Sequence, residues 1–262
     1  MINILYAVLI ITAVGLLAGV ILSVASKLMA VPTDERTEQI RACLPGANCG
    51  ACGYTGCDGY AAAISSGEAE PDKCTPGGAA TAAELSLVLG VEIAPIRIVA
   101  SVKCNHGLDK ANADFAYTGA ASCRGAKLLY GGQLQCKYGC LGFGDCVNVC
   151  EKNAISVIDG VAVVNKDLCY GCGKCAAICP NTVISLVPFE NRVKVACNNN
   201  EKGAAARKKC TAACIGCMKC VKVCESDAIK VENFLASIDA DKCTSCGKCI
   251  SACPQKCIIL DC

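Results

Sequence analysis

The sequence is poor in the side chains that usually build a protein core. Its 262 residues include no Trp, four Phe and seven Tyr, so large aromatic groups cannot supply most of the buried surface. His106 is the only histidine, which leaves haem ligation and histidine-dependent acid–base chemistry almost without support. Neither GxGxxG after a strand nor GxxxxGK[ST] occurs, and the formal net charge is only +2. We therefore predict no catalytic residue, no nucleotide site and no nucleic-acid partner.

The N-terminus has no charged residue from Met1 to Ser26. Because an α-helix rises about 1.5 Å per residue, this apolar stretch is long enough to cross a bilayer as one helix. No Lys or Arg precedes it, which argues against a cleaved signal peptide. Lys27, Arg36 and Arg41 follow it, so the positive-inside rule places the rest of the chain in the cytoplasm. We therefore predict a single-pass protein of the cell membrane with its bulk on the cytoplasmic side.

Cysteine, in contrast, is abundant, with 27 residues. A core with few aromatic groups needs disulfides or metal centres to hold it together. A reducing compartment and an odd number of cysteines both argue against a disulfide framework. Metal binding is the predicted role of most of these thiols.

The C-terminal half of the chain repeats the region before it. One constant shift, without a gap, superimposes nine cysteines on nine others, together with Gly142 on Gly216 and Pro180 on Pro254. Agreement of this extent indicates a tandem duplication. The first copy contributes Cys123, Cys136, Cys140, Cys146, Cys150, Cys169, Cys172, Cys175 and Cys179, which match Cys197, Cys210, Cys214, Cys220, Cys224, Cys243, Cys246, Cys249 and Cys253.

The second copy contains two runs of the form CxxCxxCxxxC, the second followed by Pro254. Such a pair of runs is typical of bacterial ferredoxins with two [4Fe–4S] clusters, in which the fourth cysteine of each run binds the other cluster. Zinc is the alternative, but structural zinc sites favour separated cysteine pairs around one tetrahedral ion. The predicted ligand sets are Cys214, Cys217, Cys220 and Cys253 for one cluster and Cys224, Cys243, Cys246 and Cys249 for the other.

The first copy follows the same scheme with one departure, because Phe143 occupies the place of Cys217. A thiolate is missing there, and the nearest candidate to replace it is Cys136. A cluster with three thiolates and one open iron is the alternative, a less common arrangement for electron transfer. The predicted sets are Cys136, Cys140, Cys146 and Cys179 for the first cluster and Cys150, Cys169, Cys172 and Cys175 for the second.

A separate module, NCGACGYTGC followed by a more distant cysteine, precedes the duplicated region. Gly50, Gly53 and Gly56 allow tight turns that bring backbone amides toward the sulfurs and stabilise added charge. The predicted ligands of a further [4Fe–4S] cluster are Cys49, Cys52, Cys57 and Cys74. Zinc is the alternative for this module taken alone.

Seven cysteines remain outside these sets: Cys43, Cys104, Cys123, Cys197, Cys210, Cys257 and Cys262. The segment Val102-x-Cys104-Asn105 resembles Val195-x-Cys197-Asn198. These thiols could bind another cluster, or some of them are free and buried. The sequence thus predicts about five [4Fe–4S] clusters, and six if the remaining thiols form a set.

The expected fold class is small α+β, with a single N-terminal transmembrane helix, a four-cysteine Fe–S module and two tandem ferredoxin-like units. Short β-like runs lie beside the cysteine loops, and residues 81–89 predict a short helix that ends at Gly90. The predicted parts are the transmembrane helix (1–26), the four-cysteine module (27–91), a connector (92–122), unit 1 (123–190) and unit 2 (191–262).

This order of an uncharged N-terminal helix, the NCGxCGYxGC module and ferredoxin-type runs resembles the B subunit of the Rnf complex over essentially the whole chain. The resemblance implies an electron-transfer subunit of a membrane translocase that couples electron flow between ferredoxin and NAD to Na+ or H+ transport. It implies other membrane subunits and soluble ferredoxin as partners, with the flavin and nicotinamide sites on the partner subunits. A basic cluster at Lys202, Arg207, Lys208 and Lys209 is the predicted docking site for an acidic ferredoxin.

Two other functions fit parts of the pattern. One is a membrane-tethered polyferredoxin that serves a different reductase, and the other is an interaction module whose cysteines bind zinc.

Overall fold

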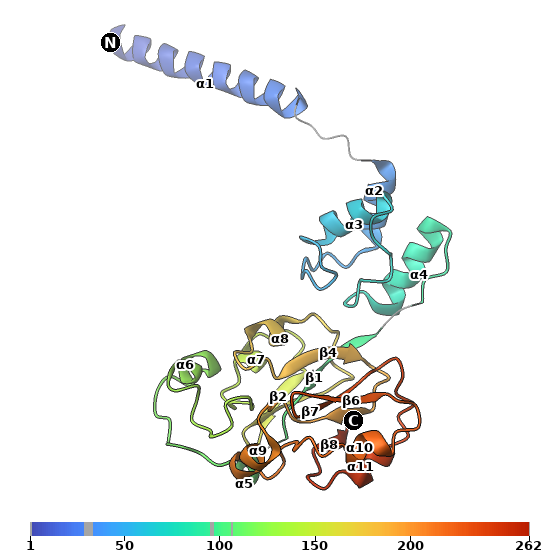
Figure 1. The fold of residues 1–262 in the computed structure, drawn as a ribbon. Coiled ribbons are helices and arrows are strands. Elements are labelled where there is room, and N and C mark those ends of the chain that lie inside the picture. The colour runs from blue at the N-terminus through green and yellow to red at the C-terminus, as the bar shows by residue number, and fades with distance from the viewer. Residues whose placement is uncertain (1, 29–33, 95–96, 106, 262) are drawn as a thin grey trace.

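The computed structural model describes residues 2–28, 34–94, 97–105 and 107–261 (Figure 1). Its first element is the helix α1 (Ile2–Leu28), which projects away from the other elements in Figure 1. Spanning a bilayer takes about 20 consecutive apolar residues in one helix. Within the described ranges no helix is long and apolar enough to cross a membrane. The predicted transmembrane helix over residues 1–26 is therefore wrong for this structure.

Three helices form a small module next in the chain: α2 (Glu35–Cys43), α3 (Cys57–Ser65) and α4 (Gly78–Leu89). The helix predicted over 81–89 is the C-terminal part of α4, and Gly90 ends it in the left-handed conformation (φ 69°) that glycine adopts readily. Ile40, Tyr60 and Leu85 are almost completely buried where the three helices meet. The Tyr60 hydroxyl donates to the Glu70 carbonyl (2.8 Å) and accepts from the Lys73 amide (3.0 Å). Tyr60 therefore fixes the loop that leads to Cys74.

Unit 1 contains two antiparallel strand pairs. Strand β1 (Ile98–Val102) pairs with β4 (Ile184–Pro188), and β2 (Ile155–Ile158) forms a hairpin with β3 (Val161–Val164). Four short helices complete the unit: α5 (Gly107–Lys110), α6 (Cys123–Leu128), α7 (Asp145–Asn148) and α8 (Lys174–Ile178). The core consists of small and branched side chains packed against cysteines, since Val102, Val183 and Ile184 lie in one cluster with several thiols.

Unit 2 repeats this arrangement with strands and helices of nearly the same length. Strand β5 (Val193–Val195) pairs with β8 (Ile258–Leu260), and β6 (Ile229–Glu232) forms a hairpin with β7 (Leu235–Ile238). The helices are α9 (Gly203–Lys209), α10 (Lys219–Lys222) and α11 (Lys248–Ala252).

The internal duplication is confirmed at the level of the backbone. Gly173 and Gly247, at matching positions, are left-handed N-caps with φ of 77° and 75°. Glu151 and Glu225 occupy matching positions, where ferredoxins usually have proline. They also make matching ion pairs, Glu151 with Lys174 and Glu225 with Lys248.

The segment predicted as a connector, residues 92–122, is partly a structural element of unit 1. It supplies β1, which is the counterpart of β5 in unit 2. Just after these strands, the Lys103 amide donates to the Val183 carbonyl and the Ala196 amide donates to the Cys257 carbonyl, both at 2.7 Å. The structural equivalent of Cys197 is consequently Cys104, whereas the gap-free sequence register matches Cys197 with Cys123.

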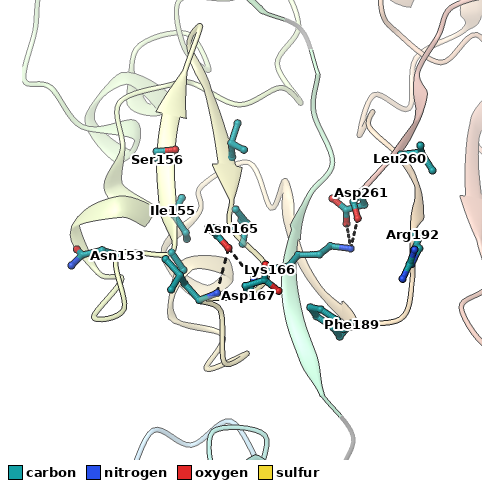
Figure 2. Close-up of a pocket in the computed structure, with 14 residues that line it drawn as sticks. Asn153, Ile155, Ser156, Asn165, Lys166, Asp167, Phe189, Arg192, Leu260 and Asp261 are labelled. Atoms are coloured by element: carbon teal, nitrogen blue, oxygen red, sulfur yellow. Dashed lines mark hydrogen bonds and ion pairs between the residues drawn. The ribbon is translucent and has the colours of Figure 1, made fainter.

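A salt-bridged seam joins the two units, and Figure 2 shows its Lys166–Asp261 pair beside a cavity of about 730 Å³. The Lys166 ammonium lies 3.1 Å from one carboxylate oxygen of Asp261, and Lys194 lies 2.6 Å from the other. Ser101 also donates to this carboxylate at 2.8 Å. None of the described residues that line this cavity is a cysteine, so the seam is structural and the redox sites lie elsewhere.

Candidate metal centres

The four cysteines of the N-terminal module lie together at the start of α3. The Asn48 side chain accepts a hydrogen bond from the Cys57 amide (2.8 Å) and so fixes the preceding loop. Gly56, at φ 114°, enters α3 in a conformation that a side chain would strain. Burial, reinforced by the neighbouring thiolates of Cys57, Cys52 and Cys49, raises the pKa of Cys74. The four thiols predicted for this module thus form one electrostatic cluster.

In the ferredoxin-like units, thiols surround small, almost wholly apolar cavities. The cavity of unit 1 next to α8 is lined by the predicted set Cys150, Cys169, Cys172 and Cys175. Backbone amides point at the sulfurs: Ala100 donates to Cys169 and Ala154 donates to Cys150, each at 3.3 Å. Amide hydrogen bonds of this kind orient metal ligands and tune their potential.

The other cavity of unit 1 differs from the prediction in one residue. It is lined by Cys123, Cys140, Cys146 and Cys179, whereas Cys136, the predicted fourth ligand, lies at a different cavity. Burial, with Cys140 and Cys123 as the nearest charged neighbours, raises the pKa of Cys146 to about 12. In this structure the cavity is therefore lined by Cys123 and not by the predicted Cys136.

Cys123 reaches this position because α6 is held against α7. Ser122 caps α6 by accepting from the Gly125 amide, and its hydroxyl donates to the Asp145 carboxylate (3.1 Å), which also accepts from the Cys123 amide (3.0 Å). Phe143, which stands where unit 2 has a ligand, packs edge-on against Tyr117 at 5.1 Å between ring centroids. The segment between Cys104 and Cys136 is much longer than its counterpart in unit 2, and the single cysteine within it was the available signal for this ligand.

Unit 2 brings together both predicted sets. One cavity is lined by Cys214, Cys217, Cys220 and Cys253. In the other set, burial together with the thiolates of Cys243, Cys246 and Cys224 raises the pKa of Cys249.

One further thiol, Cys257, lines the first of these cavities and lies where unit 1 has Val183. It is 2 % exposed. Its hydrogen bond lowers the pKa of Cys214 to about 6, and in return the contact with Cys214 strongly raises the pKa of Cys257. The contact thus favours the thiolate form of Cys214, the predicted ligand.

The donor sets fit [4Fe–4S] clusters. A cubane contains several atoms, so its thiolate ligands must surround a space and cannot all meet at one point. The cysteine sets described above surround such spaces. Burial raises the pKa of Cys175 and Cys220 to about 11, and cationic iron would offset the cost of holding such thiolates ionised. Across the described residues, no group of three or more His, Cys, Asp or Glu side chains is placed to hold a single metal ion.

Known family models match four segments of the chain. They are "Putative Fe-S cluster" over residues 44–76, "LdpA Fe-S cluster-binding domain" over 136–189 and "4Fe-4S dicluster domain" over both 168–229 and 213–257. The fold and the cysteine sets accordingly define an iron–sulfur protein of the ferredoxin type, with a separate Fe–S module ahead of its duplicated units.

Curated relatives resolve the family. The chain is 44 % identical to the B subunit of the Na(+)-translocating ferredoxin:NAD(+) oxidoreductase complex of Acetobacterium woodii, over 93 % of this chain and 74 % of the relative. It is also 44 % identical to the B subunit of the proton-translocating complex of Clostridium ljungdahlii, over 93 % and 87 %. With the B subunit of the ion-translocating oxidoreductase complex of Methanosarcina acetivorans it shares 38 % identity over 97 % of both chains. The chain belongs to the family of Rnf complex B subunits.

Proposed function

We propose that this chain is the iron–sulfur electron-transfer subunit of a membrane complex that couples electron flow between ferredoxin and NAD to the translocation of Na+ or H+. The observation that carries the proposal is the arrangement of cysteine sets as neighbouring sites along one chain. The relatives' names supply the reaction, and they include both a sodium-translocating and a proton-translocating complex.

Five ligand sets are proposed to hold five clusters. Four are the predicted ones: the N-terminal module, the second cluster of unit 1 and both clusters of unit 2. The fifth contains Cys123, Cys140, Cys146 and Cys179. When bound, each cluster accepts and releases one electron, and the protein provides the thiolates, excludes water and directs amides at the sulfurs.

The N-terminal module and the two sets of unit 1 neighbour one another in the fold. The N-terminal module contacts unit 1 beside a predicted ligand of each, since Thr75 donates to the Gly171 carbonyl at 3.5 Å. The pKa of Lys174, which is next to Cys175, is raised mainly by its pair with Glu151. The thiolate of Cys49 in the N-terminal module also raises it. Within unit 1, the thiolate of Cys175 in turn contributes to the raised pKa of Cys146. These contacts support a path for electrons from the N-terminal module into unit 1.

Soluble ferredoxin is proposed to dock on unit 2. Cys217 and Cys246, one ligand from each of its sets, are exposed, so the clusters there lie near the surface. Arg207 and Lys208 on α9 are also exposed, and a positive surface speeds encounter with an acidic partner. Lys209 of the same predicted patch is engaged with Glu201 and contributes less.

The partners at the other end of the path are proposed to be the remaining subunits of the complex, which carry the nucleotide sites that this sequence lacks. Since ion translocation requires a membrane, the chain is placed at the cell membrane, with its Fe–S units on the cytoplasmic side where ferredoxin and NAD are available.

The test uses the full chain, purified and reconstituted without oxygen. We expect a brown protein whose visible absorption bleaches on addition of reduced ferredoxin, with at least about 20 iron and 20 sulfide per chain, four of each for each of the five cubanes. Zinc in excess of iron, or iron clusters that reduced ferredoxin does not reduce, would refute the proposal.

A further inference from the structure

A fourth cysteine-lined cavity lies between the two ferredoxin-like units. The thiols at its wall are Cys104 and Cys136 from unit 1 and Cys197 and Cys210 from unit 2. Three of the four are at most 8 % exposed. None of them belongs to the five sets assigned above, and the cavity wall is almost entirely apolar apart from amide groups.

The four thiols are related by the internal duplication. Cys136 and Cys210 match in the gap-free sequence register. Cys104 and Cys197 match in structure, because each follows the first strand of its unit. Each unit therefore contributes two thiols from equivalent places, and neither unit has the set of four alone.

The surroundings of these sulfurs resemble those of the assigned ligands. The Cys140 amide donates to the Cys104 sulfur at 3.4 Å, and the Cys214 amide donates to the Cys197 sulfur at 3.3 Å. The side-chain amide of Asn199, which is fully buried, points at the Cys136 sulfur at 3.6 Å. Amide donors directed at sulfur stabilise a thiolate and would be poorly used by a neutral thiol.

We infer that Cys104, Cys136, Cys197 and Cys210 bind a sixth [4Fe–4S] cluster at the boundary between the two units. The inference rests on the proposed electron-transfer function and deepens it. The four thiols surround one small, largely apolar space, as at the assigned sites, and their ionised forms favour a cationic body there because no Lys or Arg lines the described cavity wall.

The position of this site gives it a role in the path. Cys140 belongs to the neighbouring set in unit 1 and Cys214 to the neighbouring set in unit 2, and the amide of each bonds to a sulfur of the boundary site. The boundary site therefore lies between the set that contains Cys140 in unit 1 and the set that contains Cys214 in unit 2. One electron would pass at each step, with the donor cluster oxidised, the acceptor cluster reduced and no bond made or broken.

The alternative is that these four thiols bind no cluster. Cys43 is a thiol outside every set, and its surroundings differ from those of the boundary thiols. Its sulfur donates to the Gln39 carbonyl of its own helix (3.3 Å), and it lines none of the cysteine cavities described here. It also provides a matched control for substitution.

The experiment compares the full-length chain with Cys136→Ala, Cys197→Ala and Cys43→Ala, all reconstituted anaerobically with iron and sulfide. Iron and sulfide per chain are measured, and the spins of the reduced clusters are counted by electron paramagnetic resonance. We expect about 24 iron in the unmodified chain and in Cys43→Ala, and about 20 in each of the other two variants, since each loses one cubane. Circular dichroism and the spectra of the remaining clusters show whether a variant has folded.

About 20 iron in the unmodified chain, with no further loss in Cys136→Ala or Cys197→Ala, would overturn the sixth cluster while leaving the proposed function intact. Little iron, or zinc in its place, would overturn both. If the two variants fail to fold, the iron and spin count of the unmodified chain decides alone between five and six clusters.

Discussion

Asp261 is the residue on which the contact between the two units most depends. It follows β8 of unit 2, and its carboxylate pairs with Lys166 of unit 1 (Figure 2). The same carboxylate also accepts from Ser101 of unit 1 and pairs with Lys194 of unit 2. The Lys166 and Asp261 side chains are 7 % and 10 % exposed. We predict that Asp261→Asn weakens the seam, because it leaves the Lys166 ammonium buried without its counter-charge.

The size of the free-energy cost of Asp261→Asn depends on the remaining partners of Lys166. Removing one member of a buried pair costs about 3–5 kcal/mol. The lower end applies here because the Lys166 ammonium still donates to the carbonyls of Asn191 and Asp261, both at 2.8 Å. A cost of about 3 kcal/mol corresponds to a roughly hundredfold larger population of the opened seam.

Tryptic cleavage at Arg192 measures this opening, because Arg192 is exposed at the junction of the units but the strand that follows it is paired. Cleavage tracks the population of the open form when opening and closing are fast. Glu225→Gln is the matched control, since it breaks an exposed ion pair within unit 2 (80 % and 51 % exposed) and such pairs contribute little. Equal cleavage rates for Asp261→Asn and Glu225→Gln would refute the reasoning.

The pH dependence has a definite sign. Burial acts to raise the pKa of Asp261, but the hydrogen bond and charge of Lys194, with Ser101 and Lys166, outweigh it and hold the pKa below its ordinary value of 3.8. A depressed carboxyl pKa gives stability that is present above the unfolded-state value and is lost as the pH falls through the folded-state value. The contribution of Asp261 to the seam should therefore be constant at neutral pH and disappear only in acid below 3.8.

Three further predictions concern single parts of the chain. Tyr60→Phe should destabilise the N-terminal module by about 1–3 kcal/mol, because the Glu70 carbonyl and the Lys73 amide lose their partner; unchanged cluster release from this module on heating would contradict it. Cys249→Ala should remove one cluster of unit 2 and make that unit more sensitive to proteolysis than unit 1, whereas equal digestion of both would argue against units that fold separately. Changing Arg207 and Lys208 together to Ser should slow reduction by ferredoxin at low salt and flatten its salt dependence, and an unmodified rate across an ionic-strength series would place docking elsewhere.

The amino-acid sequence alone was enough to predict the iron–sulfur chemistry and most of the local structure around it. Thiols at CxxCxxCxxxC spacing can be predicted as cluster ligands because the spacing limits which sulfurs can lie around one cubane. The duplication, the family and the paired hairpins followed from residues in register, since matching local sequences form matching turns and caps. Runs such as 155–158 and 229–232 became strands because buried or half-buried branched side chains alternate there with exposed residues.

Which thiols from distant segments meet depended instead on how the elements pack. Cys123 lines the cavity beside Cys140 and Cys146 because Asp145 anchors the start of α6, a contact that no spacing rule encodes. Cys104 and Cys197 became equivalent because β1 and β5 occupy the same edge of their units, although an insertion shifts them out of register in the sequence. The N-terminal stretch shows that composition can also mislead. It predicted a membrane-spanning helix, but none of the described helices is long and apolar enough to cross a membrane. The boundary cavity exists only because the two units pack against each other, and no single unit contains its four thiols.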